Sequence, residues 1–174
     1  MKKFLFFLST TFLTVCFVFT NSCSQPTKAG KTESSVSFIF KASSPCDAVS
    51  KTMLQIPENT ACELIKWELV LNQELNTSIP SGYTLTYVYG MSKPNTLDIL
   101  HGGTRIVKEG RWSIGKGRKQ HSEADVYQLF SANSQPYLFF LKLDDKLLHL
   151  LAPDKSLMVG NGGWSYTLNK TSEN

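Results

Sequence analysis

The sequence predicts an all-β protein, in which an antiparallel meander of about eight short strands closes into a small barrel. Three observations support this fold class. Beyond Cys62, apolar and polar residues alternate with a period of two in one segment after another. These segments are rich in aromatic and β-branched residues, and each is bounded by Gly, Asn, Asp, Ser or Pro. No segment in this part of the chain carries an apolar helical stripe longer than two turns.

Residues 1–22 are predicted to be a secretory signal peptide. Lys2 and Lys3 precede a largely apolar run from Phe4 to Phe19, which is the order of charged and apolar regions that such signals have. The run contains several Ser and Thr residues and is too short for a membrane span, which needs about 20 mainly apolar residues. The pattern therefore predicts an exported protein.

The signal ends in Thr-Asn-Ser-Cys, which resembles a bacterial lipobox with Cys23 as the acylated residue, although Thr20 stands where the usual lipobox has leucine. Ordinary cleavage after Ser22 is the alternative, since Thr20 and Ser22 also fit a small-x-small site. We favour lipidation of Cys23, because residues 23–34 have no apolar pattern and are typical of a flexible tether. Two or three acyl chains would hold the protein on a membrane, which we expect to be the outer membrane.

Residues 35–170 are predicted to form the barrel as one domain, with a short tail at 171–174, and this length is sufficient for a hydrophobic core. The formal net charge of the 174-residue chain is +4, and it falls to +2 when Lys2 and Lys3 are removed. This bias is too small to predict nucleic-acid binding. The basic cluster Gly115–His121 is predicted to be a solvated hairpin tip.

The four cysteines divide between the signal, the lipid and the domain. Cys16 leaves with the signal and Cys23 carries the lipid, so Cys46 and Cys62 remain. Because an exported protein folds in an oxidising compartment, these two are predicted to form a disulfide. A loop of this size would stabilise the domain by about 3 kcal/mol. Two cysteines without a Cys-x-x-Cys or His-x-Cys spacing do not predict a metal site.

The expected elements follow in order. A weakly alternating first strand is predicted over Val36–Phe40, and the disulfide-clamped residues 42–62 are predicted to be irregular, as a loop or one short helical turn. The later strands are expected over Leu64–Gln73, Tyr83–Met91, Thr104–Gly117, Ala124–Asn133, Tyr137–Leu143 and Gly163–Lys170. Their first two inward faces are predicted to be Ile65, Trp67, Leu69 and Leu71, and Tyr83, Leu85, Tyr87 and Tyr89.

The stretch Asp144–Pro153 fits two structures. As a helix, it would begin at a capping Asp144 and end at Pro153, with its leucines one, three and four residues apart. As strands, it would be a hairpin with the turn at Asp144 and Asp145, a second turn around Asp154 and a third strand after that turn. A lone helix of about eight residues is marginal without dedicated packing, so we favour the hairpin.

Several turn and core positions in the strand region match the pattern of a known protein family: Gly110, Trp112, Tyr127, Leu129, Asp145, Leu147, Leu148, Tyr166 and Leu168. With them, the stretch from Ile65 to Asn169 resembles the NlpE-type copper-resistance envelope lipoproteins, and more closely their Bacteroidetes-like branch. The resemblance implies a lipocalin-like barrel on a lipid tether, in a family associated with copper tolerance and envelope-stress signalling. The Cys-x-x-Cys that the family carries near the start of the barrel is missing here, since Asp-Ala-Val-Ser-Lys follows Cys46. The resemblance therefore implies the fold without that metal motif.

Histidine and methionine offer a second route to copper. Thioether and imidazole groups suit copper, so His101 and His121 could bind it together with Met91 and Met158. Nothing in their spacing requires such a site, and we predict no metal. His149 lies between leucines in a predicted strand, where it would be either a pocket ligand or, as we prefer, a structural residue with a hydrogen-bond partner at the end of the barrel.

No catalytic site and no cofactor are predicted, because the sequence contains no nucleophile elbow, zinc-protease motif or phosphate-binding glycine loop. Asp144 and Asp145 are adjacent, so their side chains would diverge across a turn and not act as an acid–base pair. Six aromatic residues would either line a ligand cavity or, as we favour, fill a small barrel: Trp67, Tyr83, Tyr87, Trp112, Phe139 and Trp164.

These observations together predict a non-enzymatic lipoprotein of the cell envelope. Cys23 would anchor it to a membrane, and its barrel would present loops or a small cavity to a protein or small-molecule partner. Two alternatives remain at this point. The protein could handle or sense copper through histidine and methionine, or it could carry an apolar ligand in a continuous cavity of about 300 Å³ or more.

Overall fold

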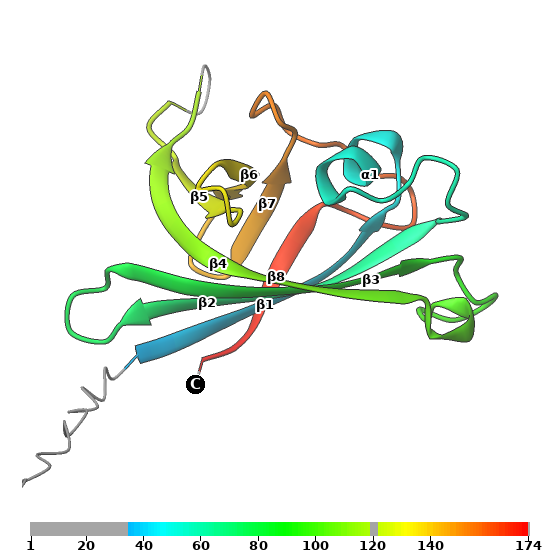
Figure 1. Cartoon of the computed structure of the whole chain (residues 1–174), viewed down its shortest axis with the longest axis horizontal. Coiled ribbons are helices and arrows are strands. Elements are labelled where there is room, and N and C mark those ends of the chain that lie inside the picture. Colours follow the sequence, from blue (N-terminus) through cyan, green and yellow to red (C-terminus); the bar gives the residue numbers. More distant parts are fainter. Residues whose placement is uncertain (1–34, 119–121, 174) are drawn as a thin grey trace, which may run out of the picture. The chain divides into compact units, whose positions relative to one another are not determined.

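The structure is a computed structural model that describes residues 35–118 and 122–173, and these residues form a closed antiparallel barrel. Its strands are β1 (Ser35–Pro45), β2 (Leu64–Glu74), β3 (Pro80–Gly90), β4 (Thr104–Lys116), β5 (Asp125–Phe130), β6 (Pro136–Lys142), β7 (Leu147–Leu151) and β8 (Thr167–Glu173). Each strand pairs with the next along the chain, and β8 returns to pair with β1 (Figure 1). The predicted all-β meander of eight strands is therefore confirmed.

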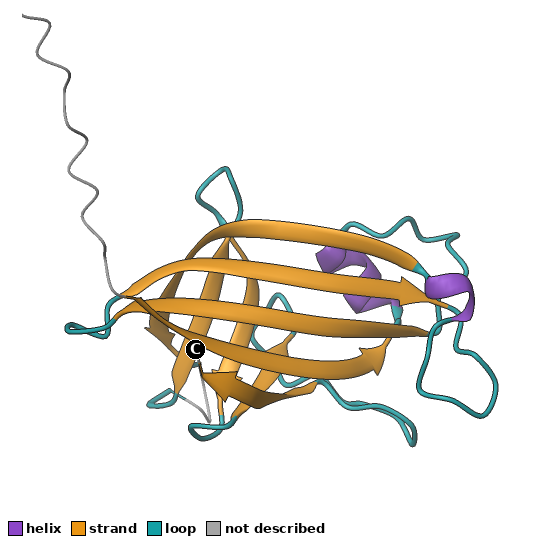
Figure 2. Cartoon of the chain, turned by 90° about the horizontal axis from the view of Figure 1, so that it is seen from below, coloured by secondary structure: helices purple, strands orange, loops and turns teal. Residues whose placement is uncertain are grey.

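The barrel has a long side and a short side. Strands β1 to β4 contain 11 to 13 residues, whereas β5 to β7 contain 5 to 7. Figure 2 shows the long strands lying side by side, with the helix α1 (Ala48–Leu54) near one end of them. We call this end, where β1 finishes at Pro45, the helix end, and the opposite end, where β1 begins, the Ser35 end. The unequal strand lengths matter for the site described below.

The predicted inward faces of β2 and β3 form the centre of the core. Leu69 and Leu85 lie opposite each other in the β2–β3 register and have no exposed surface. Leu129, Phe140 and Leu150 meet them from the other wall and are also almost completely buried. Burial of each such side chain contributes about 2 kcal/mol, so the middle of the barrel is a packed core.

Strands β5 to β7 are buried on both faces. A second cluster, formed by Val126, Phe139, Leu141 and Leu151, lies on the face that points away from the main core. Lys155, in the loop after β7, lies over the Phe139 ring of this cluster. Burial on two faces explains why these strands read as nearly continuous apolar runs and why the sequence was ambiguous there.

The ambiguous stretch Asp144–Pro153 contains a strand. Strands β6 and β7 form the predicted hairpin, which Leu143 closes by donating its N–H to the Leu147 carbonyl. The helix alternative is wrong. The third strand expected after the next turn is also wrong: it is reduced to the Leu151–Leu157 bridge, and β8 begins only at Thr167. A glycine-rich stretch from Gly160 to Gly163, which favours turns over ladders, lies between.

The segment between the two domain cysteines folds into one short helix, α1, which is more regular than the loop or helical turn expected. The Asp47 side chain caps its start by accepting the N–H of Ser50 at 2.8 Å. Gln55 ends it in the left-handed region at φ 59°. A single 3-10 turn, η1 (Leu100–Gly102), lies in the β3–β4 connection. Within the part of the chain that the structure describes, no helix is long and apolar enough to cross a membrane.

Candidate functional site

The barrel wall is open beside the first part of β4. Strand β3 pairs with β4 over Thr104–Arg111, but β5 pairs only with Trp112–Lys116 on the other edge. The reason is the shortness of β5, which ends at Phe130 before the chain turns back through residues 131–135. The edge of Thr104–Arg111 that faces away from β3 therefore has no strand partner among the described residues.

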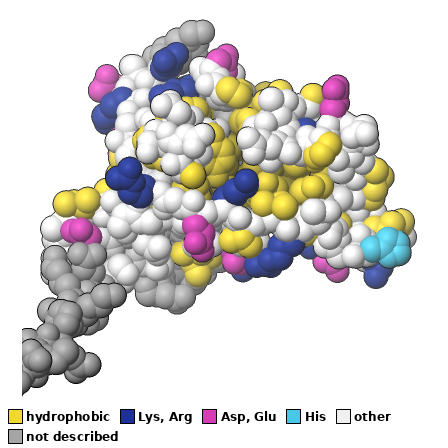
Figure 3. Space-filling view, viewed as in Figure 1, with side chains coloured by type: hydrophobic (Ala, Val, Ile, Leu, Met, Phe, Trp, Pro, Cys, Tyr) yellow, Lys and Arg dark blue, Asp and Glu magenta, His cyan; other side chains and the backbone are white. Residues whose placement is uncertain are grey.

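A pocket of about 540 Å³ lies at this opening. Helix α1 contributes Met53 and Leu54 to its wall, β3 contributes Tyr83 and Tyr87, and β6 contributes Tyr137. Figure 3 shows hydrophobic side chains gathered in a hollow between the α1 side and the β5–β7 side of the molecule. The volume lies within the range of small-molecule sites, about 300–1,000 Å³.

The tyrosines of the pocket are held by hydrogen bonds. Tyr83 donates its hydroxyl to the Phe130 carbonyl at 3.1 Å, and the hydroxyls of Tyr83 and Tyr137 are 3.1 Å apart. A tyrosine has one O–H, so Tyr137 donates to Tyr83. Tyr87 donates to the Leu54 carbonyl at 3.1 Å, which ties β3 to the helix. The Tyr137 oxygen keeps its acceptor lone pairs for a ligand.

Electrostatically, the pocket combines neutral hydroxyls with one charge of each sign. Burial raises the pKa of Tyr83 and Tyr87. Burial and then the hydrogen bond to Tyr83 raise the pKa of Tyr137 still further. The hydroxyls therefore stay protonated near neutral pH and offer hydrogen bonds, not a base. Lys108 and Glu109 are the charged residues of the lining, and both are exposed.

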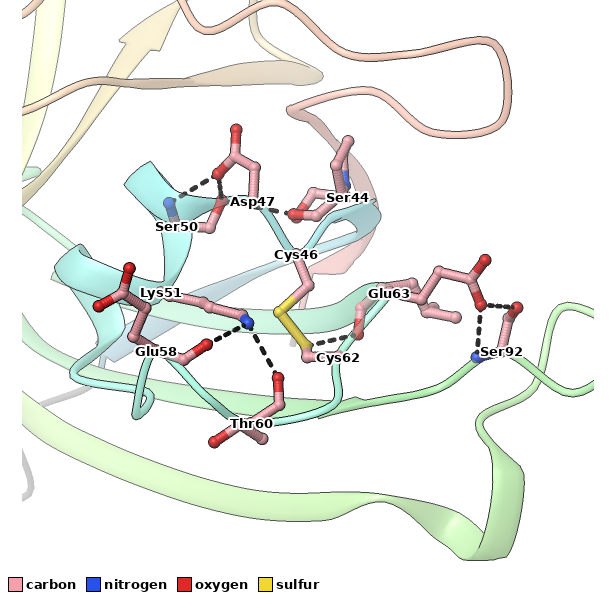
Figure 4. Close-up of a disulfide and its surroundings, with 12 residues drawn as sticks. Ser44, Cys46, Asp47, Ser50, Lys51, Glu58, Thr60, Cys62, Glu63 and Ser92 are labelled. Carbon is pink, nitrogen blue, oxygen red and sulfur yellow. Dashed lines mark hydrogen bonds between the residues drawn. A yellow bond between two sulfur atoms is a disulfide. The ribbon is translucent and has the colours of Figure 1, made fainter.

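The wall formed by α1 is fastened covalently and by hydrogen bonds (Figure 4). Cys46 and Cys62 form the predicted disulfide, with their Cα atoms 5.7 Å apart. Lys51 donates from Nζ to the carbonyls of Glu58 and Thr60, each at 2.9 Å. A seven-residue helix would not be stable alone, so these contacts determine where the wall stands.

Polar contacts also join the start of the helix to the barrel. Tyr166 donates to the second carboxylate oxygen of the capping Asp47 at 2.8 Å. Nearby, Trp67 of β2 donates from Nε1 to Ser44 at the end of β1 at 2.8 Å. Burial raises the pKa of Asp47, but the hydrogen bonds from Ser50 and Tyr166 outweigh it and leave the pKa below its ordinary value. Asp47 is thus an ionised cap at neutral pH.

A second hollow of about 440 Å³ lies at the Ser35 end and shares no lining residue with the first. Phe38, Phe40 and Trp112 are part of its lining. Five charged residues line it, and two of them, Lys142 and Asp145, form an ion pair at 2.6 Å. The lining of the pocket at the helix end has only two charged residues, so we regard that less polar pocket as the candidate site. The middle of the barrel between these two hollows is packed, so the two do not join into one continuous cavity.

The two described histidines, His101 and His149, lie in different parts of the fold. Both ring nitrogens of His149 are engaged at 2.9 Å, one with the Thr167 hydroxyl and the other with the Met158 carbonyl. This arrangement matches the structural role preferred for His149. His101 lies in η1, in the same loop as Met91, while His121 and the lipidation candidate Cys23 lie outside the described residues. Among the residues that are described, no three His, Cys, Asp or Glu side chains are grouped to hold a metal ion.

The aspartates and aromatic residues singled out in the sequence have separate roles. Asp144 accepts the backbone N–H of Lys146, whereas Asp145 pairs with Lys142, so the two carboxylates diverge as predicted. The predicted aromatic residues divide among the main core (Trp67, Tyr83, Tyr87 and Trp112), the second cluster (Phe139) and a half-buried loop position (Trp164). Of these six, only Tyr83 and Tyr87 line the candidate pocket.

Sequence reasoning missed Tyr137, Met53 and Leu54 as pocket residues. Tyr137 lies beside a register shift between β5 and β6, and the sequence analysis assigned no inward face to its strand. The α1 residues were missed because their segment has no strand pattern. The Met-Leu pair ahead of Pro57 was the available signal that this segment contributes to a core.

The site as a whole is a half-open, largely apolar pocket with neutral hydroxyl groups, one lysine and one glutamate at its rim. This chemistry suits reversible binding of an amphipathic group. Comparisons of the chain with protein-family models, with curated proteins and with solved structures found no match.

Proposed function

We propose that this protein is a non-enzymatic, lipid-anchored protein of the cell envelope whose barrel binds an amphipathic ligand or partner segment in the pocket at the helix end. The observation that carries the proposal is the pocket of about 540 Å³ between α1 and the open wall beside β4. Apolar surface from Met53 and Leu54 would take up the apolar part of a ligand. The Tyr137 hydroxyl and Lys108 would take up its polar or anionic part.

The arrangement of the walls supports binding. The disulfide and the hydrogen bonds of Tyr83 and Tyr87 hold three sides of the pocket in place, so little conformational entropy would be lost when a ligand enters. The fourth side is the open edge of β4, which gives a ligand access.

Pocket binding is tested by filling the space. Ala132 lies in an exposed turn and lines the pocket, so Ala132→Trp should occupy it without disturbing the core. We expect the purified Cys23→Ala chain to bind the dye anilinonaphthalene sulfonate, and Ala132→Trp in that background to weaken binding at least about tenfold. Dye fluorescence titration measures this, and near-ultraviolet circular dichroism checks that both proteins are folded.

Asn76→Trp provides a matched control, because it places the same ring in an exposed turn at the Ser35 end. Its dye affinity should equal that of the parent chain. If Ala132→Trp and Asn76→Trp bind the dye equally well, the pocket at the helix end is not the binding site.

The anchor is tested separately. If Cys23 is acylated in cells, a clickable fatty acid should label the wild-type chain, and Cys23→Ala should lose the label and move from the membrane to the soluble fraction. Labelling of both proteins to the same extent would contradict lipidation at Cys23. The reason for expecting acylation is the position of this cysteine directly after the apolar run of the signal.

A role in envelope-stress signalling is part of the same proposal and comes from the family resemblance stated for Ile65–Asn169. Copper handling is the alternative, and it would depend on His101, His121, Met91 and Met158. We place binding of an amphipathic partner ahead of it, because the pocket at the helix end is formed by described residues.

A further inference from the structure

We propose that the open edge of β4, Thr104–Arg111, pairs with an extended acidic segment of a partner protein. That segment would add one strand to the barrel wall and place an apolar side chain in the pocket at the helix end. This inference deepens the proposed function, on which it rests, by naming the class of partner and how it is held.

The edge is long and exposed. Thr104–Arg111 has β3 on one side and no strand partner on the other, and all of its residues except Ile106 and Gly110 are exposed. Strands in globular proteins usually have about 5–6 residues, so a whole strand fits along this edge. Unpaired edges are ready-made templates for another chain, and main-chain hydrogen bonds would provide much of the affinity.

The open edge of β4 is continuous with the pocket at the helix end. Lys108 and Glu109 belong to the edge and also line the pocket. A strand added beside β4 would lie about 4.8 Å from it, which is directly over the opening. Alternate side chains of that strand point to the inner face of the wall, so one of them would enter the space between Leu54 and Tyr137.

The charge of the open edge distinguishes between possible partners. The edge carries Arg105, Lys108 and Arg111 against Glu109, and within the described residues none of these four forms an ion pair. A second copy of this chain would bring the same positive excess against it and is disfavoured. An acidic segment would neutralise the excess, so an acidic extended partner fits best.

The experiment starts with an unbiased probe. The full chain, solubilised in mild detergent, is panned against a phage-displayed library of random peptides of roughly 12 residues. We expect the enriched peptides to be acidic and to share one large apolar residue. Fluorescence anisotropy of a synthetic copy of the best peptide then gives its affinity, and light scattering shows whether the protein stays monomeric.

N-methylation of the peptide backbone tests strand pairing directly. In an added strand, alternate N–H groups point toward β4, so methylating one set of alternate residues should weaken binding at least about tenfold, while methylating the other set should change it little. On the protein side, the double variant Arg105→Glu with Lys108→Glu should weaken binding at least about tenfold. Arg118→Glu, an exposed residue at the Ser35 end, should not.

Three results would overturn the inference: no enriched peptide, N-methyl effects without a two-residue period, or self-association of the chain through this edge. None of them decides the proposed function, which depends on whether Ala132→Trp weakens dye binding more than Asn76→Trp does. A chain that binds the dye but pairs with no peptide would retain the pocket and lose the strand-pairing partner.

Discussion

Replacing Trp67 by alanine is expected to lower the free energy of unfolding by about 4 kcal/mol. Trp67 lies in the middle of β2 with only 3% of its surface exposed, and it packs against Tyr87 with the ring centroids 6.2 Å apart. The loss of this ring leaves a cavity in a barrel that cannot collapse around it, because the strands on both sides are hydrogen-bonded. The indole also donates to Ser44, whose hydroxyl would lose a buried partner.

Urea denaturation followed by far-ultraviolet circular dichroism measures this change, and the thermal midpoint should fall by more than about 10 °C. Trp67→Phe is the matched control, because it keeps most of the ring volume and removes the N–H. It should cost about 1–2 kcal/mol. A Trp67→Ala protein as stable as Trp67→Phe would show that the barrel interior is not packed around this residue.

Removal of the disulfide has the second largest expected effect. The double variant Cys46→Ser with Cys62→Ser should be less stable by about 3 kcal/mol, since the bond closes a loop with a sequence separation of 16 and its loss frees the unfolded chain. It should also weaken dye binding, because the disulfide holds the start of the α1 segment, which supplies Met53 and Leu54 to the pocket.

The contribution of the disulfide to stability can also be measured on the wild-type chain by reducing it. A reducing agent should shift the denaturation midpoint of the wild type towards that of the double variant and leave the variant unchanged. Stability that does not respond to reduction would mean that the contacts of Lys51 and Asp47 alone are enough to hold the helix. In that case dye binding should also survive reduction.

The two predictions depend on different parts of the molecule. Trp67 belongs to the regular alternation of β2, so its buried position could be read from the sequence. The disulfide could be inferred because the signal and the lipidation motif account for the other two cysteines. Neither inference located the candidate pocket, since both concern features that support the barrel and not the places where its wall is incomplete.

The sequence by itself determined the barrel class, the inward faces of β2 and β3, the β6–β7 hairpin and the Cys46–Cys62 pair. These follow from local rules, namely a period of two, turn residues between strands, and the chemistry of an oxidising compartment. The tertiary structure alone decided where the barrel opens. That opening depends on β5 ending at Phe130, so that it pairs with Trp112–Lys116 and leaves Thr104–Arg111 of β4 without a second strand. Such differences arise from the pairing between strands, and the alternation within one strand contains no information about the length of its neighbour.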